Sequence, residues 1–284
     1  MNDLFAAAPK DLRAARLREY HQYLVERDGE LDVKARSLSR RELSITRYET
    51  APTTTRDMNA AEFRQQYLAF DKRKPHSPEM LLLLSLVKVN GAEAYGVSQN
   101  FQRVLDRALR NDDEIELRIL CEECYHTRIL LSTANRYGIE VTDAYRPPSP
   151  MRVLIGGIAV APMMIARPLT LAGEIVGTLT FVKLLRAAQR VLKHDPETRD
   201  AIEERLLEIA TDEFGHISYN RMSMGPVELA QARLLLPITA RMLARTFPEI
   251  VALDAFPINV LEELSLFADP RRLPERVRSD AFLA

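Results

Sequence analysis

Hydrophobic residues recur every three or four positions along most of this chain, which is the spacing of amphipathic helices. No stretch alternates convincingly with a period of two, so the expected fold class is all-α. Residues 33–58, with the loop sequence APTTTRD, lack a regular pattern, and prolines interrupt the tail beyond residue 246. The predicted helices cover residues 10–27, 59–72, 78–110, 114–137, 168–192, 196–224 and 226–246.

Polar residues, glycine and proline mark the ends of these helices. The run Arg110-Asn-Asp-Asp113 separates the third predicted helix from the fourth, and its acidic residues suit a helix start. Gly138 is the expected C-cap of the fourth helix. A rigid proline-rich connection, residues 146–150, leads to an apolar run over residues 153–166, which is a candidate lining or gate for a pocket.

Composition narrows the class of protein. The chain has 284 residues, 46% of them apolar, which is enough for one large domain or two small ones. Its 39 basic and 40 acidic residues leave a net charge of −1, which makes a nucleic-acid partner unexpected. The first residues lack a signal-peptide pattern, and the apolar run 153–166 is shorter than the ~20 residues that span a bilayer. The two cysteines give no disulfide framework, so we expect a cytoplasmic protein with no membrane partner.

Two of the five histidines follow a glutamate by three positions, as Glu123-Cys-Tyr-His126 and Glu213-Phe-Gly-His216. At this spacing the carboxylate and the imidazole lie on one face of a helix. Both motifs interrupt apolar stripes, where a carboxylate without a partner is costly. A counter-ion is therefore implied, and this donor set suits iron or manganese better than a thiolate-preferring ion.

Two further glutamates are expected to stand level with these motifs in antiparallel helix hairpins. Two residues of a hairpin are level when the turn lies midway between them in sequence. For Glu93 and Glu123 the midpoint falls just before the break that follows the third predicted helix. For Glu174 and Glu213 it falls on the turn at residues 193–196, whereas a pairing of Glu79 with Glu123 would need a turn inside a helix. The predicted metal ligands are Glu93, Glu123, His126, Glu174, Glu213 and His216.

The order Glu, Glu-x-x-His, Glu, Glu-x-x-His resembles the ligand pattern of the ferritin-like di-iron carboxylate superfamily. The resemblance covers residues 80–224. The segment Ile119-Leu-Cys-Glu-Glu-Cys-Tyr-His126, followed by Tyr137-Gly138, is most similar to the soluble di-iron oxygenases around p-aminobenzoate N-oxygenase. That group usually has a third histidine at the position of Ile209 in this chain.

The resemblance implies a ferritin-like four-helix bundle over residues 76–224, with helical extensions over residues 1–75 and 225–284, in one domain overall. It also implies an O2-dependent oxygenase or oxidase that hydroxylates, desaturates or N-oxygenates a small organic substrate. The cofactors would be two iron ions, or manganese with iron, and O2 would be the co-substrate. The chain has no Rossmann fingerprint and too few cysteines for an iron–sulfur cluster, so we expect a separate reductase or ferredoxin. A monomer or homodimer suits the two extensions better than a cage.

Further residues near the predicted ligands have two interpretations each. Thr178 lies one turn after Glu174 and resembles a threonine thought to assist oxygen activation, or it bonds to its own helix. Gly96 and Gly177 each follow a lone glutamate by three positions and either open a substrate space or allow close helix packing. Phe181 and Ile209 are expected to line the same space as these glycines.

Asp212 and Glu122 each precede a ligand glutamate, where the superfamily has carboxylates that orient the histidines. We favour this role for Asp212 and a solvent-facing position for Glu122. The superfamily more often has aspartate at both positions and arginine just before each histidine. This chain has Tyr125 and Gly215 there.

Other interpretations remain open. A Cys-x-x-Cys pair, Cys121 and Cys124, is expected to be two small buried residues, although a redox dithiol has the same spacing. A ferroxidase or iron-storage protein would use the same ligands. A second alternative is a tRNA-modifying di-iron hydroxylase, which would have to bind RNA. A third is a helical interaction protein without metal, in which the two Glu-x-x-His motifs arise by chance.

Overall fold

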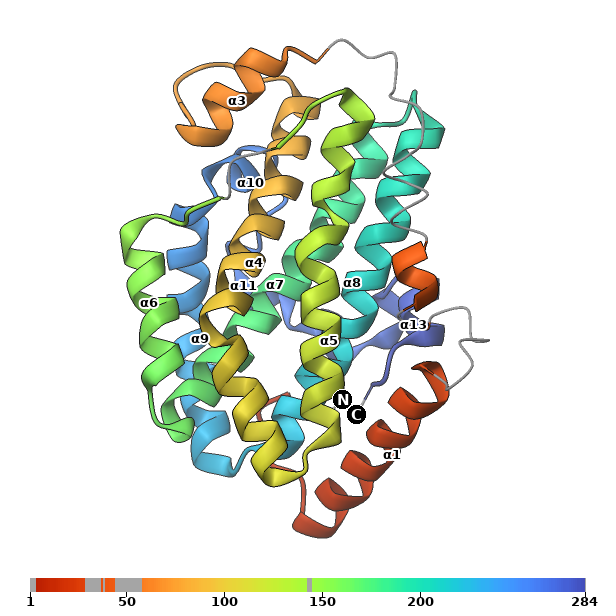
Figure 1. The fold of residues 1–284 in the computed structure, drawn as a ribbon, viewed down its shortest axis with the longest axis vertical. Coiled ribbons are helices and arrows are strands. Elements are labelled where there is room, and N and C mark those ends of the chain that lie inside the picture. Colours follow the sequence, from red (N-terminus) through yellow and green to blue (C-terminus); the bar gives the residue numbers. More distant parts are fainter. Residues whose placement is uncertain (1–3, 29–36, 38, 44–57, 142–144, 284) are drawn as a thin grey trace.

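The structure, a computed structural model, describes residues 4–28, 37, 39–43, 58–141 and 145–283 of the chain. Within these ranges it contains α-helices and two short 3-10 helices but no strand, which confirms the all-α class (Figure 1). The helices are α1 (Lys10–Asp28), α3 (Ala60–Leu68), α4 (Pro78–Asn111), α5 (Glu114–Ile129), η1 (Leu131–Tyr137), α6 (Ser149–Val160), α7 (Met163–Val191), α8 (Pro196–Ser223), α9 (Pro226–Thr246), α10 (Pro248–Ala252), α11 (Val260–Glu263), α12 (Ser265–Ala268), η2 (Pro270–Arg272) and α13 (Glu275–Asp280).

Four long helices surround the centre of the molecule. α4 packs along α5 and α7 along α8, while α4 also contacts α7 and α5 contacts α8, so the four enclose a common interior. The turn between α4 and α5 depends on two aspartates. Asp112 adopts a left-handed conformation with φ 52°, and Asp113 caps α5 by accepting a hydrogen bond from the Glu116 amide. These hairpins bring residues that are distant in sequence to the same level of the interior.

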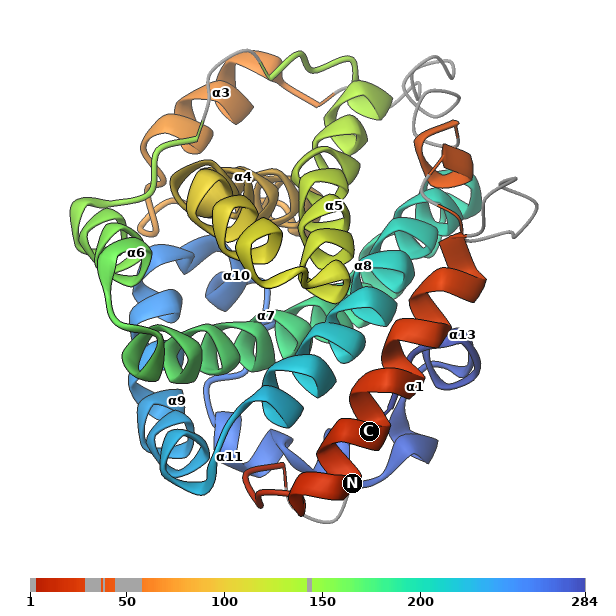
Figure 2. The ribbon, with the colours of Figure 1, turned by 60° about the horizontal axis from the view of Figure 1, so that its bottom comes forward.

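The extensions cover the outside of these four helices. α1 lies along α8 and also contacts α5 (Figure 2). α9 packs along α7, and α13 returns to α8. One cluster of buried apolar side chains runs from Leu4 through α4, α7 and α8 to Val277, so both extensions contribute to the central core.

Several predicted boundaries were wrong. The helix predicted from residue 168 begins at Met163, and Pro168 lies inside it, where it removes one backbone hydrogen bond without ending the helix. The apolar run 153–166 belongs to α6 and the start of α7, with the break at Ala161-Pro162. The predicted helix 114–137 is α-helical only as far as Ile129 and continues as η1, which ends at the predicted C-cap Gly138 in a left-handed conformation with φ 65°.

The prediction that residues 33–58 are irregular was also partly wrong. Residues 39–43 are helical, whereas the loop at residues 51–57 lies outside the described residues. The predicted helix 59–72 is shorter, since α3 ends at Leu68.

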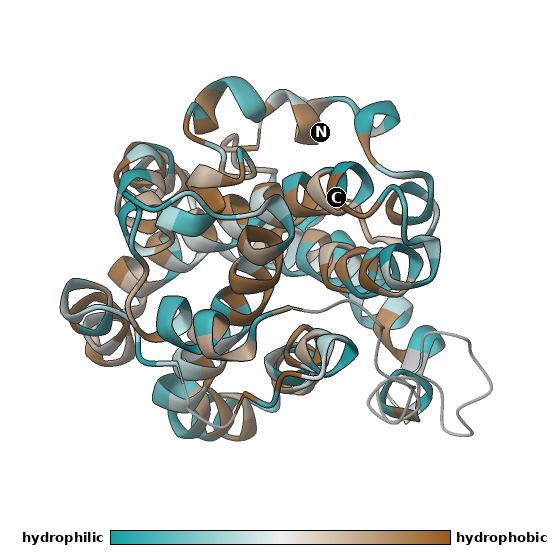
Figure 3. Cartoon of the chain, turned by 90° about the horizontal axis from the view of Figure 1, so that it is seen from above, coloured by the Kyte–Doolittle hydropathy of each residue, from teal (hydrophilic) through white to brown (hydrophobic). Residues whose placement is uncertain are grey.

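Hydrophobic residues are most frequent in the central helices, with hydrophilic residues around them (Figure 3). By length and composition alone, α4 and α7 are apolar enough to cross a membrane. In the most apolar window of each, 56% and 67% of the residues are buried against the rest of the chain. Their composition is thus explained by the core that they form.

Candidate metal centre

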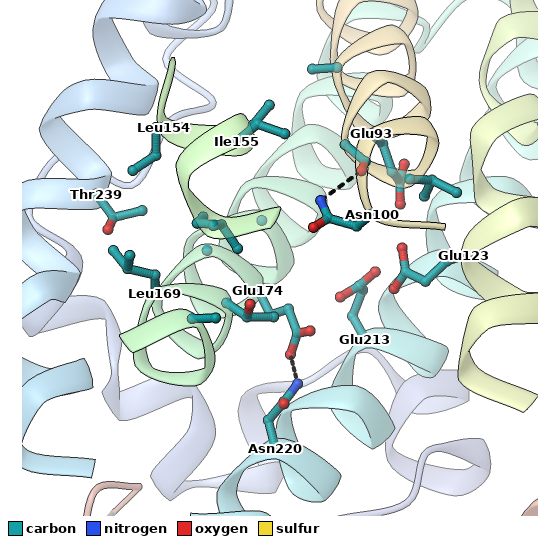
Figure 4. A pocket seen from close by; sticks show the side chains of 18 of the residues that line it. Glu93, Asn100, Glu123, Leu154, Ile155, Leu169, Glu174, Glu213, Asn220 and Thr239 are labelled. Carbon is teal, nitrogen blue, oxygen red and sulfur yellow. Dashed lines mark hydrogen bonds between the residues drawn. The ribbon is translucent and has the colours of Figure 1, made fainter. Parts of the chain in front are cut away.

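The two Glu-x-x-His motifs face each other from α5 and α8. One ligand atom from each of Glu93, Glu123, His126 and Glu213 lies within 4.8 Å of the others, and these residues come from α4, α5 and α8. His216 adjoins the same cluster. The carboxylates of Glu93, Glu123 and Glu213 point toward one another at the edge of a cavity (Figure 4).

Glu213 lies between the two histidines. Its carboxylate is 3.4 Å from His126 Nδ1 through one oxygen and 3.8 Å from His216 Nδ1 through the other. Each histidine also approaches a glutamate of its own: His126 Nδ1 is 3.4 Å from Glu93 Oε1, and His216 Nδ1 is 2.9 Å from Glu123 Oε1. The arrangement therefore has two similar halves joined by Glu213.

Three buried polar atoms of this cluster have no hydrogen-bond partner. They are Nδ1 of His126, Nδ1 of His216 and Oε2 of Glu93. The contacts within the cluster thus do not align as hydrogen bonds. An unpaired buried donor or acceptor costs about 1–3 kcal/mol, so three of them in one place imply a ligand that accepts their lone pairs. The residues present fit a hard or borderline cation held by carboxylate and imidazole.

The opposite nitrogen of each imidazole is held by a carboxylate from the facing helix. His126 Nε2 lies 3.0 Å from Asp212 Oδ2, and His216 Nε2 lies 3.0 Å from Glu122 Oε2. When Nε2 carries the proton and donates to the carboxylate, Nδ1 is left free to bind a metal. The solvent-facing position favoured for Glu122 is wrong, because its side chain is completely buried. α5 is covered at this level by α1 and α8, which a single-helix pattern does not show.

Two arginines from the N-terminal extension neutralise these outer carboxylates. Arg41 pairs with Asp212 and lies 3.5 Å from Glu122, and Arg27 pairs with Glu122 and lies 3.2 Å from Asp212. Burial and the nearby Asp212 raise the pKa of Glu122, but Arg27 and His216 outweigh them and the net shift is downward. Sequence reasoning missed both arginines, because neither belongs to a motif and Arg41 lies in the region predicted to be irregular.

The arginines of this chain thus reach the site from outside the four long helices. At Gly215, where the superfamily more often has an arginine, a Cβ atom would lie 2.8 Å from the Tyr20 hydroxyl. α1 therefore packs directly on α8 at this point and leaves no room for a longer side chain. Arg27, two turns further along α1, carries the positive charge to Glu122 instead.

Glu174 lies apart from the tight cluster but lines the same cavity. The Asn220 side chain donates a hydrogen bond of 2.7 Å to Glu174 Oε2 (Figure 4). Burial, reinforced by the charge of Glu213, raises the pKa of Glu174 to about 8. Burial likewise raises the pKa of Glu93 to about 7, against the opposing effect of His126. Glu213 behaves differently, since its interactions with the two imidazoles outweigh burial and lower its pKa to about 2.

Asn90 connects α4 to the end of α5. Its side-chain amide donates to the His126 carbonyl and its oxygen accepts a 2.8 Å hydrogen bond from the Leu131 amide. The residue is completely buried. Like Arg27 and Arg41, it was not predicted from the sequence, and it fixes the backbone that carries His126.

Replacing Asn90 with alanine should destabilise the fold by about 1–3 kcal/mol, because two buried backbone groups lose their partner. Asn100→Ala is the matched control, since Asn100 bonds only to Gly96 of its own helix. Denaturant unfolding followed by circular dichroism measures both. Equal stability of the two variants would contradict the bridging role.

The lining of the cavity can be compared with the predicted positions of five other residues. It has a volume of about 460 Å³, and Gly96, Gly177 and Phe181 line it as expected. Ile209 does not line it and lies in the apolar core instead, so its placement in the pocket was wrong. Thr178 is also buried away from the cavity lining, and its hydroxyl donates to the Glu174 carbonyl at 2.7 Å. This is the helix-bonded alternative for Thr178, because a hydroxyl used in this way does not face the cavity.

The expected burial of the two cysteines was wrong. Cys121 is exposed and Cys124 is partly exposed on α5, because this part of the helix surface is not covered by other described elements. Neither residue belongs to the metal-ligating cluster.

Comparison of the chain with known protein families, with curated proteins and with solved structures finds no match.

Proposed function

We propose that this protein is an O2-dependent non-haem di-iron oxygenase or oxidase of the ferritin-like type, acting on a small organic substrate. One observation carries the proposal: two Glu-x-x-His motifs face each other, and both imidazole Nδ1 atoms are buried without hydrogen-bond partners. Each of these imidazoles is oriented by a carboxylate from the opposite helix. Imidazoles oriented in this way, with Nδ1 turned toward carboxylates, are what a metal centre requires of its protein.

One iron would be held by Glu93, His126 and Glu213, and the other by Glu123, His216 and Glu213, with Glu174 available from the side. Two iron ions bound in this way supply the reduction of O2 and the oxidation of the substrate. The chain's own residues do the rest. Asp212 and Glu122 orient the imidazoles, Asn220 positions Glu174, and apolar side chains keep water from the cavity. Since the chain carries no electron-transfer motif, a separate reductase or ferredoxin would supply electrons.

The cavity favours an oxygenase or oxidase over iron storage. A volume of about 460 Å³ lies within the range of sites for organic ligands, and it opens on the carboxylates that would bind the metals. An iron-storage protein needs a path for iron, whereas this cavity has many apolar side chains in its lining, Leu154, Ile155 and Leu169 among them. Gel filtration separates the two functions, since a storage cage is a very large particle.

Purified protein reconstituted with ferrous iron under anaerobic conditions should hold about two iron ions per chain, the number in carboxylate centres of this pattern. Adding O2 to the loaded protein should produce a transient absorption band, because the metals are oxidised. Iron determination and stopped-flow spectroscopy measure the two results. An iron content no higher than that of a protein without such a cluster would contradict the proposal.

A further inference from the structure

The cavity follows one face of α7, and its lining changes from charged to apolar along this helix. Arg167, Glu174 and Phe181 line it at intervals of seven residues, which is two helical turns. A rise of about 1.5 Å per residue places Arg167 and Phe181 about 21 Å apart along the helix axis. The candidate metal centre therefore lies beside the middle of an elongated space.

One end of this space is apolar and aromatic. Phe181 of α7, Phe247, Ile250 and Phe256 line it there. The polar lining residue Thr180 uses its hydroxyl to bond to the Val176 carbonyl at 2.7 Å. No charged residue of the described chain lines this end, so it suits an alkyl chain.

The other end contains three arginines, of which two are occupied. Arg107 is paired with Glu116, with a 2.9 Å bond from Nε, and Arg103 donates to backbone carbonyls at the end of α6. Arg167 makes no ion pair with any described residue, and its side chain donates one long hydrogen bond, of 3.4 Å, to the Ser223 carbonyl. Its guanidinium is thus the positive group at this end that a bound anion can engage.

Between the two ends, glycines leave the space open. A Cβ atom built on Gly173, Gly177 or Gly96 would meet nothing within 4 Å. Glycine inside a helix costs about 1 kcal/mol relative to alanine, and close packing does not explain these three because no neighbour touches them. They keep a passage clear past the carboxylates of Glu93 and Glu174.

Building on the proposed function, we propose that the cavity binds an anionic amphiphile, a carboxylate on an unbranched alkyl chain. The carboxylate lies at Arg167, the chain runs along α7 past the metal centre, and the chain end lies among the aromatic residues around Phe181. The part of the substrate nearest the metals is then the interior of the chain, remote from the carboxylate. Leu154, Ile155 and Leu169 form the wall of this passage (Figure 4).

The test uses the metal-free, full-length protein and isothermal titration calorimetry with hexanoate, decanoate and decanol. Decanoate should bind at least about tenfold more tightly than decanol, because a charge-assisted hydrogen bond is gained, and each added methylene should strengthen binding about fourfold. Arg167→Met should lower decanoate affinity about tenfold or more and leave decanol affinity unchanged. Arg190→Met, on the same helix but outside the cavity, should leave both unchanged.

Gly177→Leu should weaken decanoate and decanol alike, because its side chain enters the passage. Leucine is a better helix former than glycine, so this variant should fold. Decanol binding by Arg167→Met serves as a check that this variant is folded as well. Failure of decanoate to saturate the wild-type protein, or an unchanged preference for decanoate in Arg167→Met, would overturn the inference.

Iron loading is measured separately and separates the two proposals. If the protein binds iron but not decanoate, the di-iron proposal is supported and the amphiphile proposal is contradicted. If the protein binds decanoate specifically but takes up no iron, the amphiphile proposal is supported and the di-iron proposal is contradicted.

Discussion

Glu213→Ala is expected to remove most of the bound iron from both positions, the largest effect of any single ligand substitution. Among the residues that the structure describes, Glu213 is the one whose carboxylate lies within 4 Å of both imidazole Nδ1 atoms. Glu93, Glu123, His126 and His216 each serve one half of the cluster, so losing one of them leaves the other metal position with its donors. Iron per chain after anaerobic reconstitution and desalting measures the effect.

Two variants make this expectation specific. Glu204→Gln removes an exposed carboxylate from the same helix and should keep the wild-type iron content. Glu123→Ala should keep one iron, because His126, Glu93 and Glu213 remain in place. If Glu213→Ala lost no more iron than Glu123→Ala, Glu213 would not join the two halves.

The metal-free fold gives a second comparison. Glu213 is buried, and its interactions with His126 and His216 lower its pKa. Alanine removes this negative charge from between the two imidazoles, so the apoprotein should lose stability as well. Denaturant unfolding of the apoprotein distinguishes a lost ligand from an unfolded chain.

The long helices, and the placing of Glu93 level with Glu123, could be predicted from sequence because both follow from local rules. Hydrophobic spacing locates the long helices, and Asp113 and Asp195 cap α5 and α8 where a polar break was expected. Once two helices are antiparallel, the position of the turn decides which residues are level. That geometry brought Glu93 to Glu123 without any knowledge of side-chain contacts.

The outer part of the site could not be predicted in this way. The burial of Glu122 depends on α1 lying over α5, and the periodicity of α5 alone shows only that one face of it is polar. Arg27 and Arg41 come from segments with no pattern that points to the site. Such contacts depend on tertiary packing between distant segments, which hydrophobic spacing does not encode.

Thr178 and Ile209 do not border the cavity, and the reason is related. Both lie at helical spacing from a ligand residue, yet the inward face of a core helix is wider than the strip that borders the cavity. Spacing places a residue on the inward face, and the neighbouring helices decide whether it meets open space or another side chain. Ile209 meets the apolar core, and Thr180 borders the cavity in place of Thr178.

Arg41→Met is expected to have the largest effect on folding stability, a loss of about 3–5 kcal/mol. Arg41 is 1% exposed, and it pairs with Asp212 and approaches Glu122, both of which are also buried. Without Arg41, Arg27 is the one arginine left beside the two buried carboxylates among the described residues, and losing one partner of a buried ion pair is strongly destabilising. Arg16→Met is the matched control, because Arg16 pairs with Glu19 on the surface and its loss should cost at most about 1 kcal/mol. Denaturant unfolding of the metal-free protein measures both variants.

The same substitution should also lower iron affinity, by about tenfold to a hundredfold, the usual effect of losing a group that orients a metal ligand. Arg41 acts on the metal only through Asp212 and Glu122, which hold the imidazoles of His126 and His216. Arg41→Lys keeps the charge and should restore part of the stability, but a lysine makes one contact where the guanidinium reaches two carboxylates, so iron affinity should recover less. If Arg41→Met unfolded no more easily than Arg16→Met, the two carboxylates would be compensated without it, and the N-terminal extension would be only a cover for the four long helices.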